Sequence, residues 1–275
     1  MSEPVTVVTW VVPALNFLYE HREDFPTTWD NFMSYLNGKK ANLVITGAAG
    51  VGKTVLLDHL SGVAPKIGYT PPGRSDKTEK QNVASAGIRM GYRVVPGQAS
   101  RPRLEALDRV FTNKEPVDGV IHVVANGHAS VREAATLEVL SDPIGLDLNR
   151  WLEERRQSEL QDLEETLRFI KQSHRKHGGQ PKWLLVAVAK LDLFYDKHAE
   201  AQLYYHADSN SPFVQMLNKA TNELGTQNFR WNALPVCSYL DRYTWSGGTV
   251  SPQLTEPERD FFLTQFGAEI MRLCQ

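Results

Sequence analysis

The segment ITGAAGVGKTVLL, residues 45–57, restricts the fold of this chain more than any other stretch. It joins a short apolar, β-branched run over 41–46, typical of a buried parallel strand, to a run over 53–62 whose apolar residues recur at helical spacing. The loop between them fits the pattern G-x-x-x-x-G-K-[ST] through Gly47, Gly52, Lys53 and Thr54. A strand before this pattern and a helix after it are the context that it requires.

A loop of this composition predicts a site for nucleotide phosphates. Glycines let the backbone turn tightly with its N–H groups directed inward, and the following helix N-terminus adds a partial positive charge. We expect Lys53 to reach the β- and γ-phosphates and the Thr54 hydroxyl to hold Mg²⁺. The alternative is an ordinary glycine-rich turn before a helix. The residues expected at the nucleotide here are Gly47, Ala48, Ala49, Gly50, Val51, Gly52, Lys53, Thr54 and Val55.

The composition is that of a globular protein: of 275 residues, 41% are hydrophobic and 23% are charged. The 30 basic and 32 acidic residues leave a net charge of −2, so no overall field favours nucleic acid as a partner. Cys237 and Cys274 form no C-x-x-C pair and suggest no disulfide framework, so we expect a cytoplasmic location. The uncharged run over 5–19 is shorter than the roughly 20 residues of a membrane span, and we expect no such span.

Strand-like and helix-like stretches alternate after the first loop. The sequence predicts further strands ending at Val95 and over 118–127, 182–194 and 231–240, and helices over 103–114, 158–179 and 256–274. It also predicts an exposed loop over 66–82 and an insertion near 128–150.

This order of elements predicts an α/β fold: a three-layer P-loop NTPase with a mostly parallel, doubly wound sheet and helices on both faces. Residues 1–40 are expected to form an N-terminal extension packed on the core, and residues 41–275 the nucleotide-binding domain. The ligand of such a sheet lies at the carboxyl ends of its strands.

Two strand ends carry groups that suit a guanine base. In AKLD, residues 189–192, the Asp192 carboxylate can accept from guanine N1–H and the exocyclic amine, while the Lys190 stem lies over the base. In VCSY, residues 236–239, a backbone N–H can meet the guanine carbonyl. A solvated Asp at a strand end is the alternative. The residues expected at the base are Lys190, Asp192, Cys237 and Ser238.

A third stretch, VPGQ at 95–98, suits the γ-phosphate end. Gly97 would let the backbone approach that phosphate, and Gln98 would orient an attacking water. A plain type II turn is the alternative reading. VPGQ, AKLD and VCSY follow a phosphate loop in this order, which favours a nucleotide site over the alternative interpretation of each stretch.

From about Asn42 to Ser238 the chain resembles the Ras-like small GTPases of the P-loop GTPase class. GAAGVGKT is similar to their phosphate loop, PGQ to the end of D-x-x-G-Q, AKLD to N-K-x-D, and Cys237-Ser238 to the guanine loop. Gln98 follows Lys53 by 45 residues, a spacing close to the family's. The resemblance implies GTP and GDP as ligands, Mg²⁺ as cofactor, and hydrolysis of GTP to GDP and phosphate by Lys53 and Gln98. It further implies a switch region over 66–103 that contacts a protein effector or regulator.

The chain departs from the family pattern at three places. Val94 stands where the family has the Asp that supports Mg²⁺ through water, and Ala189 replaces the Asn that ties the base to the phosphate loop. Pro72 falls near the position of the family's switch threonine, so either Thr70 or Thr78 would contact Mg²⁺ instead, or neither would. Loss of the Asp leaves open a second function, a nucleotide-bound scaffold with weak catalysis. An ATPase of another P-loop class would need an acid ending an apolar run, and VIHVVANG supplies none.

The stretch from Arg74 to Arg103 holds seven basic and two acidic residues. It is read either as a solvated loop or as a surface for an acidic partner. Arg74, four residues before Thr78, is a candidate for an arginine supplied in cis to the phosphates.

Overall fold

The computed structural model describes residues 41–60, 79–85, 88–94, 101–130, 148–245 and 248–274. The expected N-terminal extension, most of the switch region and residues 131–147 of the expected insertion lie outside the described residues. In the part that is described, no helix is both long and apolar enough to cross a membrane.

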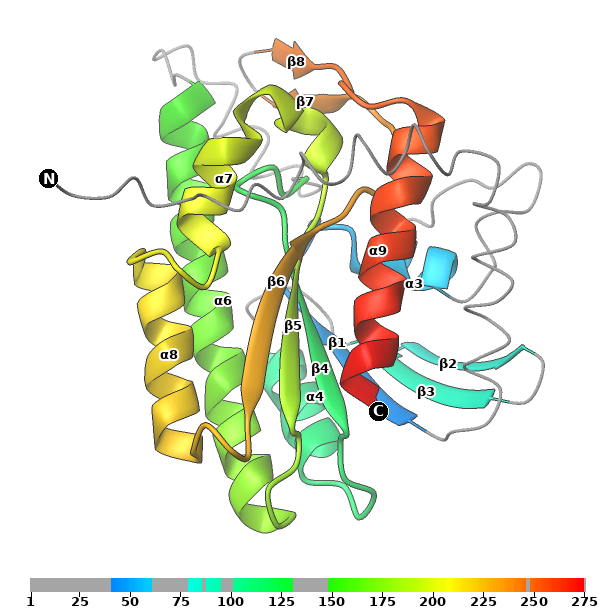
Figure 1. The fold of residues 1–275 in the computed structure, drawn as a ribbon, viewed down its shortest axis with the longest axis vertical. Helices are drawn as coiled ribbons and strands as arrows, with labels where there is room; N and C mark the ends of the chain where they lie inside the picture. Colours follow the sequence, from blue (N-terminus) through cyan, green and yellow to red (C-terminus); the bar gives the residue numbers. More distant parts are fainter. Residues whose placement is uncertain are drawn as a thin grey trace, which may run out of the picture.

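A six-stranded sheet in the order β2-β3-β1-β4-β5-β6 forms the centre of the molecule (Figure 1). Its strands are β1 (Ala41–Thr46), β2 (Glu79–Ser85), β3 (Ile88–Val94), β4 (Gly119–Val124), β5 (Trp183–Val188) and β6 (Arg230–Pro235). All neighbours are parallel except the edge strand β2, which pairs antiparallel with β3. Every residue of β4 and β5 is buried, as expected for central strands covered on both faces.

Helices cover both faces of this sheet. The described helices are α3 (Lys53–Leu60), α4 (Arg101–Phe111), α6 (Leu148–Lys176), α7 (His198–Tyr205), α8 (Pro212–Leu224) and α9 (Glu256–Cys274). Alternate residues of β4 point into two separate cores, Val120 and Val124 toward the helices α4, α6 and α8, and Ile121 and Val123 toward α3 and α9. A short hairpin, β7 (Tyr243–Trp245) and β8 (Gly248–Val250), precedes α9 (Figure 1). The predicted three-layer α/β fold is confirmed.

Several predicted boundaries were wrong. The last four residues of the expected 66–82 loop belong to β2, whose polar sequence EKQN carries no alternating hydrophobic signal. The long charged helix α6 begins at Leu148, ten residues before the prediction, because Trp151 is buried and donates its Nε1–H to the Tyr243 hydroxyl at 2.8 Å. The strand predicted over 182–194 ends at Val188, and that over 231–240 at Pro235.

Two helices were not predicted. Of these, α8 has a recognisable start, because the Ser211 side chain accepts from the Val214 N–H at 3.1 Å and Pro212 occupies the first helical turn. The other, α7, is only eight residues long and follows two turns of 3₁₀ helix.

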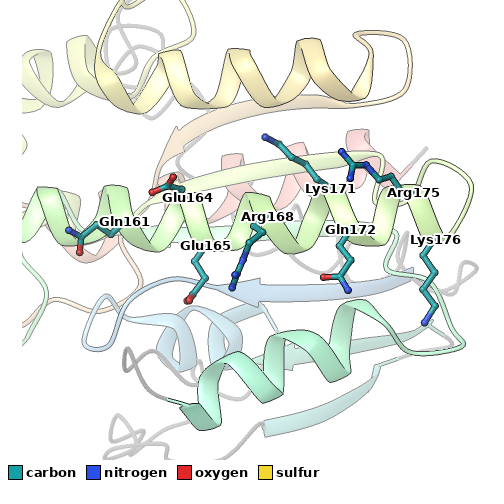
Figure 2. A pocket seen from close by; sticks show the side chains of 8 residues that line it. All are labelled: Gln161, Glu164, Glu165, Arg168, Lys171, Gln172, Arg175 and Lys176. Atoms are coloured by element: carbon teal, nitrogen blue, oxygen red, sulfur yellow. The ribbon is translucent and has the colours of Figure 1, made fainter.

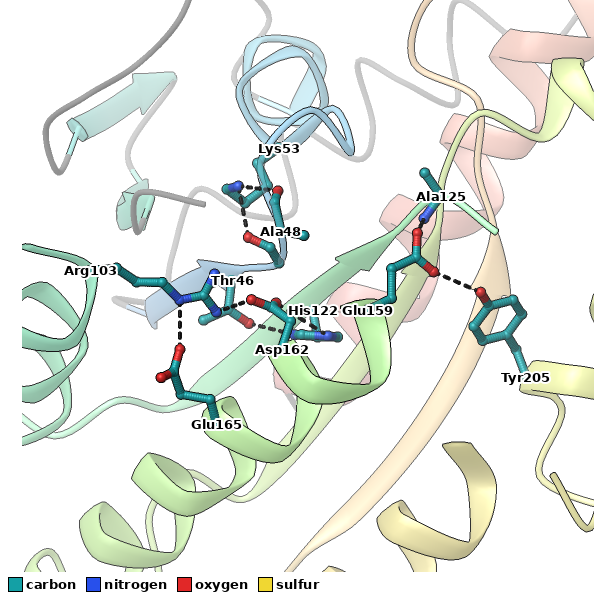
Figure 3. A network of polar contacts seen from close by, with 11 residues as sticks. Thr46, Ala48, Lys53, Arg103, His122, Ala125, Glu159, Asp162, Glu165 and Tyr205 are labelled. Atoms are coloured by element: carbon teal, nitrogen blue, oxygen red, sulfur yellow. Dashed lines mark hydrogen bonds and ion pairs between the residues drawn. The ribbon is translucent and has the colours of Figure 1, made fainter. Parts of the chain in front are cut away.

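A buried polar cluster joins α4 to α6 and to the sheet (Figure 3). The Arg103 guanidinium, 2% exposed, pairs with the Asp162 carboxylate, and its Nε lies 2.8 Å from Glu165 Oε2. His122 Nε2 lies 3.9 Å from Asp162 Oδ2, and His122 Nδ1 lies 2.9 Å from the Thr46 hydroxyl at the end of β1. The interpretation of the whole Arg74 to Arg103 stretch as solvated is therefore wrong for Arg103, whose charge is neutralised inside the protein.

Replacing Asp162 by Ala should strongly destabilise the protein, because it leaves a buried guanidinium with less compensation. At pH 8 the Asp162 carboxyl, whose pKa burial raises to about 6, is ionised. We expect a loss of about 3 kcal/mol in the free energy of unfolding in urea. Glu164→Ala, an exposed position on the same helix, serves as control and should change it by less than about 0.5 kcal/mol. Equal effects of the two variants would contradict the buried pair.

Candidate functional site

The loop between β1 and α3 has the backbone that a phosphate loop requires. Gly47, Gly50 and Gly52 have φ angles of 132°, 78° and 102°, which L side chains rarely adopt. Space is restricted as well. A Cβ on Gly47 would lie 2.2 Å from the Val123 carbonyl oxygen, and one on Gly50 would lie 2.1 Å from that of Ser130. The glycines at 47 and 50 are therefore required both by conformation and by contact with the end of β4 and the segment after it.

Lys53 lies at the start of α3 with its side chain folded over the loop. Its ammonium donates to the Gly47 carbonyl at 2.8 Å and to the Ala48 carbonyl at 2.7 Å (Figure 3). The side chain is largely buried, at 8% exposure, whereas Thr54 beside it is half-buried. A fixed positive charge at a helix N-terminus, bordered by loop amides, is suited to binding an anion.

The expected base-reading residues come together at the ends of β5 and β6. Lys190 has a φ of 58°, in the left-handed region, and turns the chain into a 3₁₀ turn that holds Asp192. The Cys237 thiol donates to Asp192 Oδ1 at 3.2 Å, and the Leu191 N–H donates to the Val236 carbonyl at 3.3 Å. The two strand ends are therefore hydrogen-bonded to each other by both side chain and backbone.

Burial governs the chemistry of this turn, residues 190–192, which we call the base turn. Asp192 is 1% exposed, and burial raises the pKa of its carboxyl to about 6 while the Cys237 thiol opposes that rise. Burial likewise raises the pKa of the Cys237 thiol well above its usual value. Ser238 is 8% exposed. Since Asp192 is almost completely covered, recognition of a base by this carboxylate requires a movement that uncovers it.

The segment after β4, residues 125–130, lies between the phosphate loop and the base turn. The Ser130 N–H donates to the Gly50 carbonyl at 3.1 Å, and the Lys190 ammonium donates to the Ser130 hydroxyl at 2.8 Å and to the His128 carbonyl at 2.6 Å. His128 and Ser130 fall in the insertion predicted near 128–150, and no role was predicted for either residue. The turn dipeptide Asn126-Gly127 was the available signal that the chain reverses here.

Glu159 of α6 is a second group at this site for which the sequence predicted no role. One carboxylate oxygen accepts from the backbone N–H of Ala125 at 2.9 Å, and the other accepts from the Tyr205 hydroxyl at 2.9 Å (Figure 3). The first oxygen also accepts from the Gly127 N–H at 3.2 Å. Burial raises the pKa of Glu159 to about 7, against the effect of these hydrogen bonds. An acid in the middle of an amphipathic helix pattern gives no sign that it is buried, so only the fold identifies it.

The γ-phosphate end of the expected site is only partly described. Gly97, Gln98, Thr78, Thr70 and Arg74 lie outside the described residues, and their expected roles stay predictions. Val94 ends β3 and pairs with Ile45 next to the phosphate loop, so an aliphatic residue stands at the strand end where the resemblance to Ras-like GTPases would place an Asp. Within the described ranges, no group of three or more His, Cys, Asp or Glu residues forms a metal site.

A groove of about 940 Å³ lies away from this site, along the outer face of α6 (Figure 2). It is lined by Gln161, Glu164, Glu165, Arg168, Lys171, Gln172, Arg175 and Lys176. Two of its cations have partners elsewhere: Lys171 pairs with Glu223 at 2.6 Å, and Lys176 donates to the Thr112 carbonyl at 2.7 Å. None of the expected nucleotide ligands lines this groove.

Comparison with known proteins leaves the family open. No family model and no curated protein matches this chain. Among solved structures, 706 chains match. One is the crystal structure of a dimerisation-deficient mutant of Toc33 from Arabidopsis thaliana, at 12% identity and a TM-score of 0.44, covering 95% of this chain and 97% of that chain. The fold assignment therefore rests on this chain's own strand order and on the loop between β1 and α3.

Gly50→Ala should be far more costly than the same change at Gly178. Gly178 also has a positive φ, 61°, but no atom lies within 4 Å of an added Cβ, so Gly178→Ala carries the backbone penalty alone, about 1 kcal/mol. At Gly50 the methyl group would additionally overlap the Ser130 carbonyl. We expect a loss of at least about 3 kcal/mol in urea-induced unfolding. Similar losses for the two variants would mean that Ser130 does not pack on the phosphate loop.

Proposed function

We propose that this chain binds guanine nucleotides and hydrolyses GTP to GDP and phosphate, acting as a molecular switch for a protein partner. The observation that carries the proposal is the loop at 47–52, with its left-handed glycines and the Lys53 ammonium at the start of α3. Its connection through Ser130 to Lys190 supports a single ligand that extends from this loop to the base turn.

In this proposal the phosphates occupy the concave side of the loop. Lys53 exchanges its bonds to the Gly47 and Ala48 carbonyls for bonds to the β- and γ-phosphates, and the loop N–H groups neutralise further charge. Gly97 would face the γ-phosphate, and Gln98 would orient the attacking water.

Mg²⁺ fits this site in part. The Thr54 hydroxyl stands in the first turn of α3, where it can ligate the ion, and Thr78 is proposed as the second threonine ligand. When bound, Mg²⁺ supplies charge neutralisation to the β- and γ-phosphates. Val94 cannot contribute a carboxylate. This supports the second candidate, a nucleotide-bound scaffold that hydrolyses slowly, and phosphate release in a single turnover with and without Mg²⁺ separates the two.

Base selection is proposed to lie with Asp192, which accepts from two guanine donors that adenine does not offer in the same geometry. The Lys190 stem would cover the base, and the backbone at Cys237 and Ser238 would meet its carbonyl oxygen. The hydrogen bond from Cys237 supports this role, because it holds one oxygen of the Asp192 carboxylate in a defined orientation.

The partner surface is proposed to lie in the 66–103 region. The hairpin of β2 and β3 belongs to it, and β2 ends the described sheet, so its outer edge can pair with a strand of another protein. Arg103 is excluded from this surface by its burial. No nucleic acid is expected as a partner, since the net charge is only −2. A cytoplasmic location is proposed for the whole protein.

Lys53→Ala should abolish tight nucleotide binding, because it removes a positive charge at the phosphates. Isothermal titration with GDP and with GTP at physiological salt should give affinities at least about 100-fold weaker, equivalent to ~3 kcal/mol. The control is Lys219→Ala. Lys219 is an exposed residue of α8, a helix that packs on α6 and β6, and this variant should bind both nucleotides as the wild type does. Unchanged affinity in the Lys53 variant would refute the phosphate-loop assignment.

A further inference from the structure

The 125–130 segment contacts both halves of the proposed nucleotide site with one residue. The backbone N–H of Ser130 is bonded to Gly50 in the phosphate loop, and its side-chain hydroxyl is bonded to the ammonium of Lys190 in the base turn. The contact with Gly50 is close, since even one added carbon there would overlap the Ser130 backbone. Movement of either half therefore acts directly on Ser130.

The segment itself is firmly held. Glu159 accepts from the N–H groups of Ala125 and Gly127, so its first half is fixed to α6. The His128 ring stacks on Phe194 at a centroid distance of 5.4 Å and meets Tyr243 edge-on at 5.3 Å. Burial lowers the pKa of His128 to about 4, so the ring is neutral at physiological pH. A segment fixed in this way can transmit force between its two neighbours.

Lys190 is oriented by the same segment. Its ammonium has acceptors on the His128 carbonyl and the Ser130 hydroxyl, and it also lies 5.5 Å from the centre of the Tyr243 ring. Ala189, the residue before Lys190, has no side-chain group that could reach the phosphate loop, and its N–H donates to the Val124 carbonyl. The connection between base turn and phosphate loop described here is therefore made by Ser130 and Lys190.

We propose that Ser130 is a positioning residue that couples the phosphate loop to the base turn, with Lys190 as its partner. The inference rests on the proposed function, because it assigns the coupling to the nucleotide site. A nucleotide that contacts Gly50 at one end and Lys190 at the other would bind more tightly, because Ser130 keeps these two residues at the required separation before binding.

The test is a double-mutant cycle on GDP binding. Ser130→Ala removes only the hydroxyl, and Lys190→Met keeps the aliphatic stem but removes the ammonium. We expect Ser130→Ala to weaken GDP binding about three- to tenfold, mainly through faster dissociation. In the Lys190→Met background the same change should alter affinity by less than about twofold, because its partner is already gone. Effects that multiply in the double variant would overturn the proposal.

Two further variants separate positioning from general stability. Ser130→Thr keeps a hydroxyl and should restore GDP dissociation to within about twofold of the wild type. Ser158→Ala removes an exposed hydroxyl that, among the described residues, donates to the Glu154 carbonyl of the same helix at 3.3 Å, and this variant should bind GDP as the wild type does. Wild-type GDP dissociation in Ser130→Ala would also overturn the proposal.

Hydrogen exchange decides the contact without any nucleotide. The Ser130 amide should exchange at least about tenfold faster in Lys190→Met than in the wild type. The reason is that loss of the Lys190 ammonium weakens the hydrogen bond from the Ser130 N–H to the Gly50 carbonyl. An unchanged rate would overturn the proposal. If GDP binds to neither the wild type nor any variant, the proposed function fails, and this exchange rate still shows whether Ser130 and Lys190 act together.

Discussion

The close approach of two backbones, that of the phosphate loop and that of the chain leaving β4, is the contact on which the rest of the site depends. Gly47 packs against the Val123 carbonyl and Gly50 against that of Ser130, so neither position has space for a side chain. The parallel pairing of β1 with β4 brings the two backbones together, with Thr46 opposite His122. The same pairing directs the loop at 47–52 and the start of α3 toward the carboxyl edge of the sheet, where an α/β fold binds its ligands.

Two buried acids of α6 stabilise this edge in different ways. Glu159 holds the segment after β4 through backbone N–H groups, whereas Asp162, one turn further, neutralises Arg103 of α4. Burial raises the pKa of both carboxyls, while their hydrogen bonds and ion pairs act in the opposite direction. The helix α6 is thus attached on one side to the proposed nucleotide site and on the other to the start of α4, which follows the expected water-orienting residue Gln98. A conformational change of the segment that contains Gln98 would have to leave Arg103 in place, because Arg103 is held by Asp162 and Glu165.

The sequence predicted the parts of the molecule in which local pattern and tertiary role coincide. Buried parallel strands are continuous apolar runs, and the loop at 47–52 needs glycines for conformational reasons, so both could be read directly. The edge strand β2 was not predicted, because it is a strand through its pairing with β3 and not through a hydrophobic pattern. The burial of Arg103 and Glu159 could not be predicted from the sequence, because charged residues on helices are usually exposed. Only contacts between distant segments reverse that preference. The role of Ser130 likewise depends on partners 60 and more residues away.

The central claim, a guanine nucleotide at this edge, is tested most directly at Asp192. Asp192→Asn keeps the shape of the side chain and its acceptor for the Cys237 thiol, but gives it an amide donor that suits xanthine, which carries a carbonyl in place of the guanine amine. In competition binding the wild type should prefer GTP to XTP and ATP. The variant should lose GTP affinity by about 10- to 100-fold, the scale of hydrogen bonds to a charged group, and gain affinity for XTP. A variant that keeps the wild-type order of preference would contradict the account.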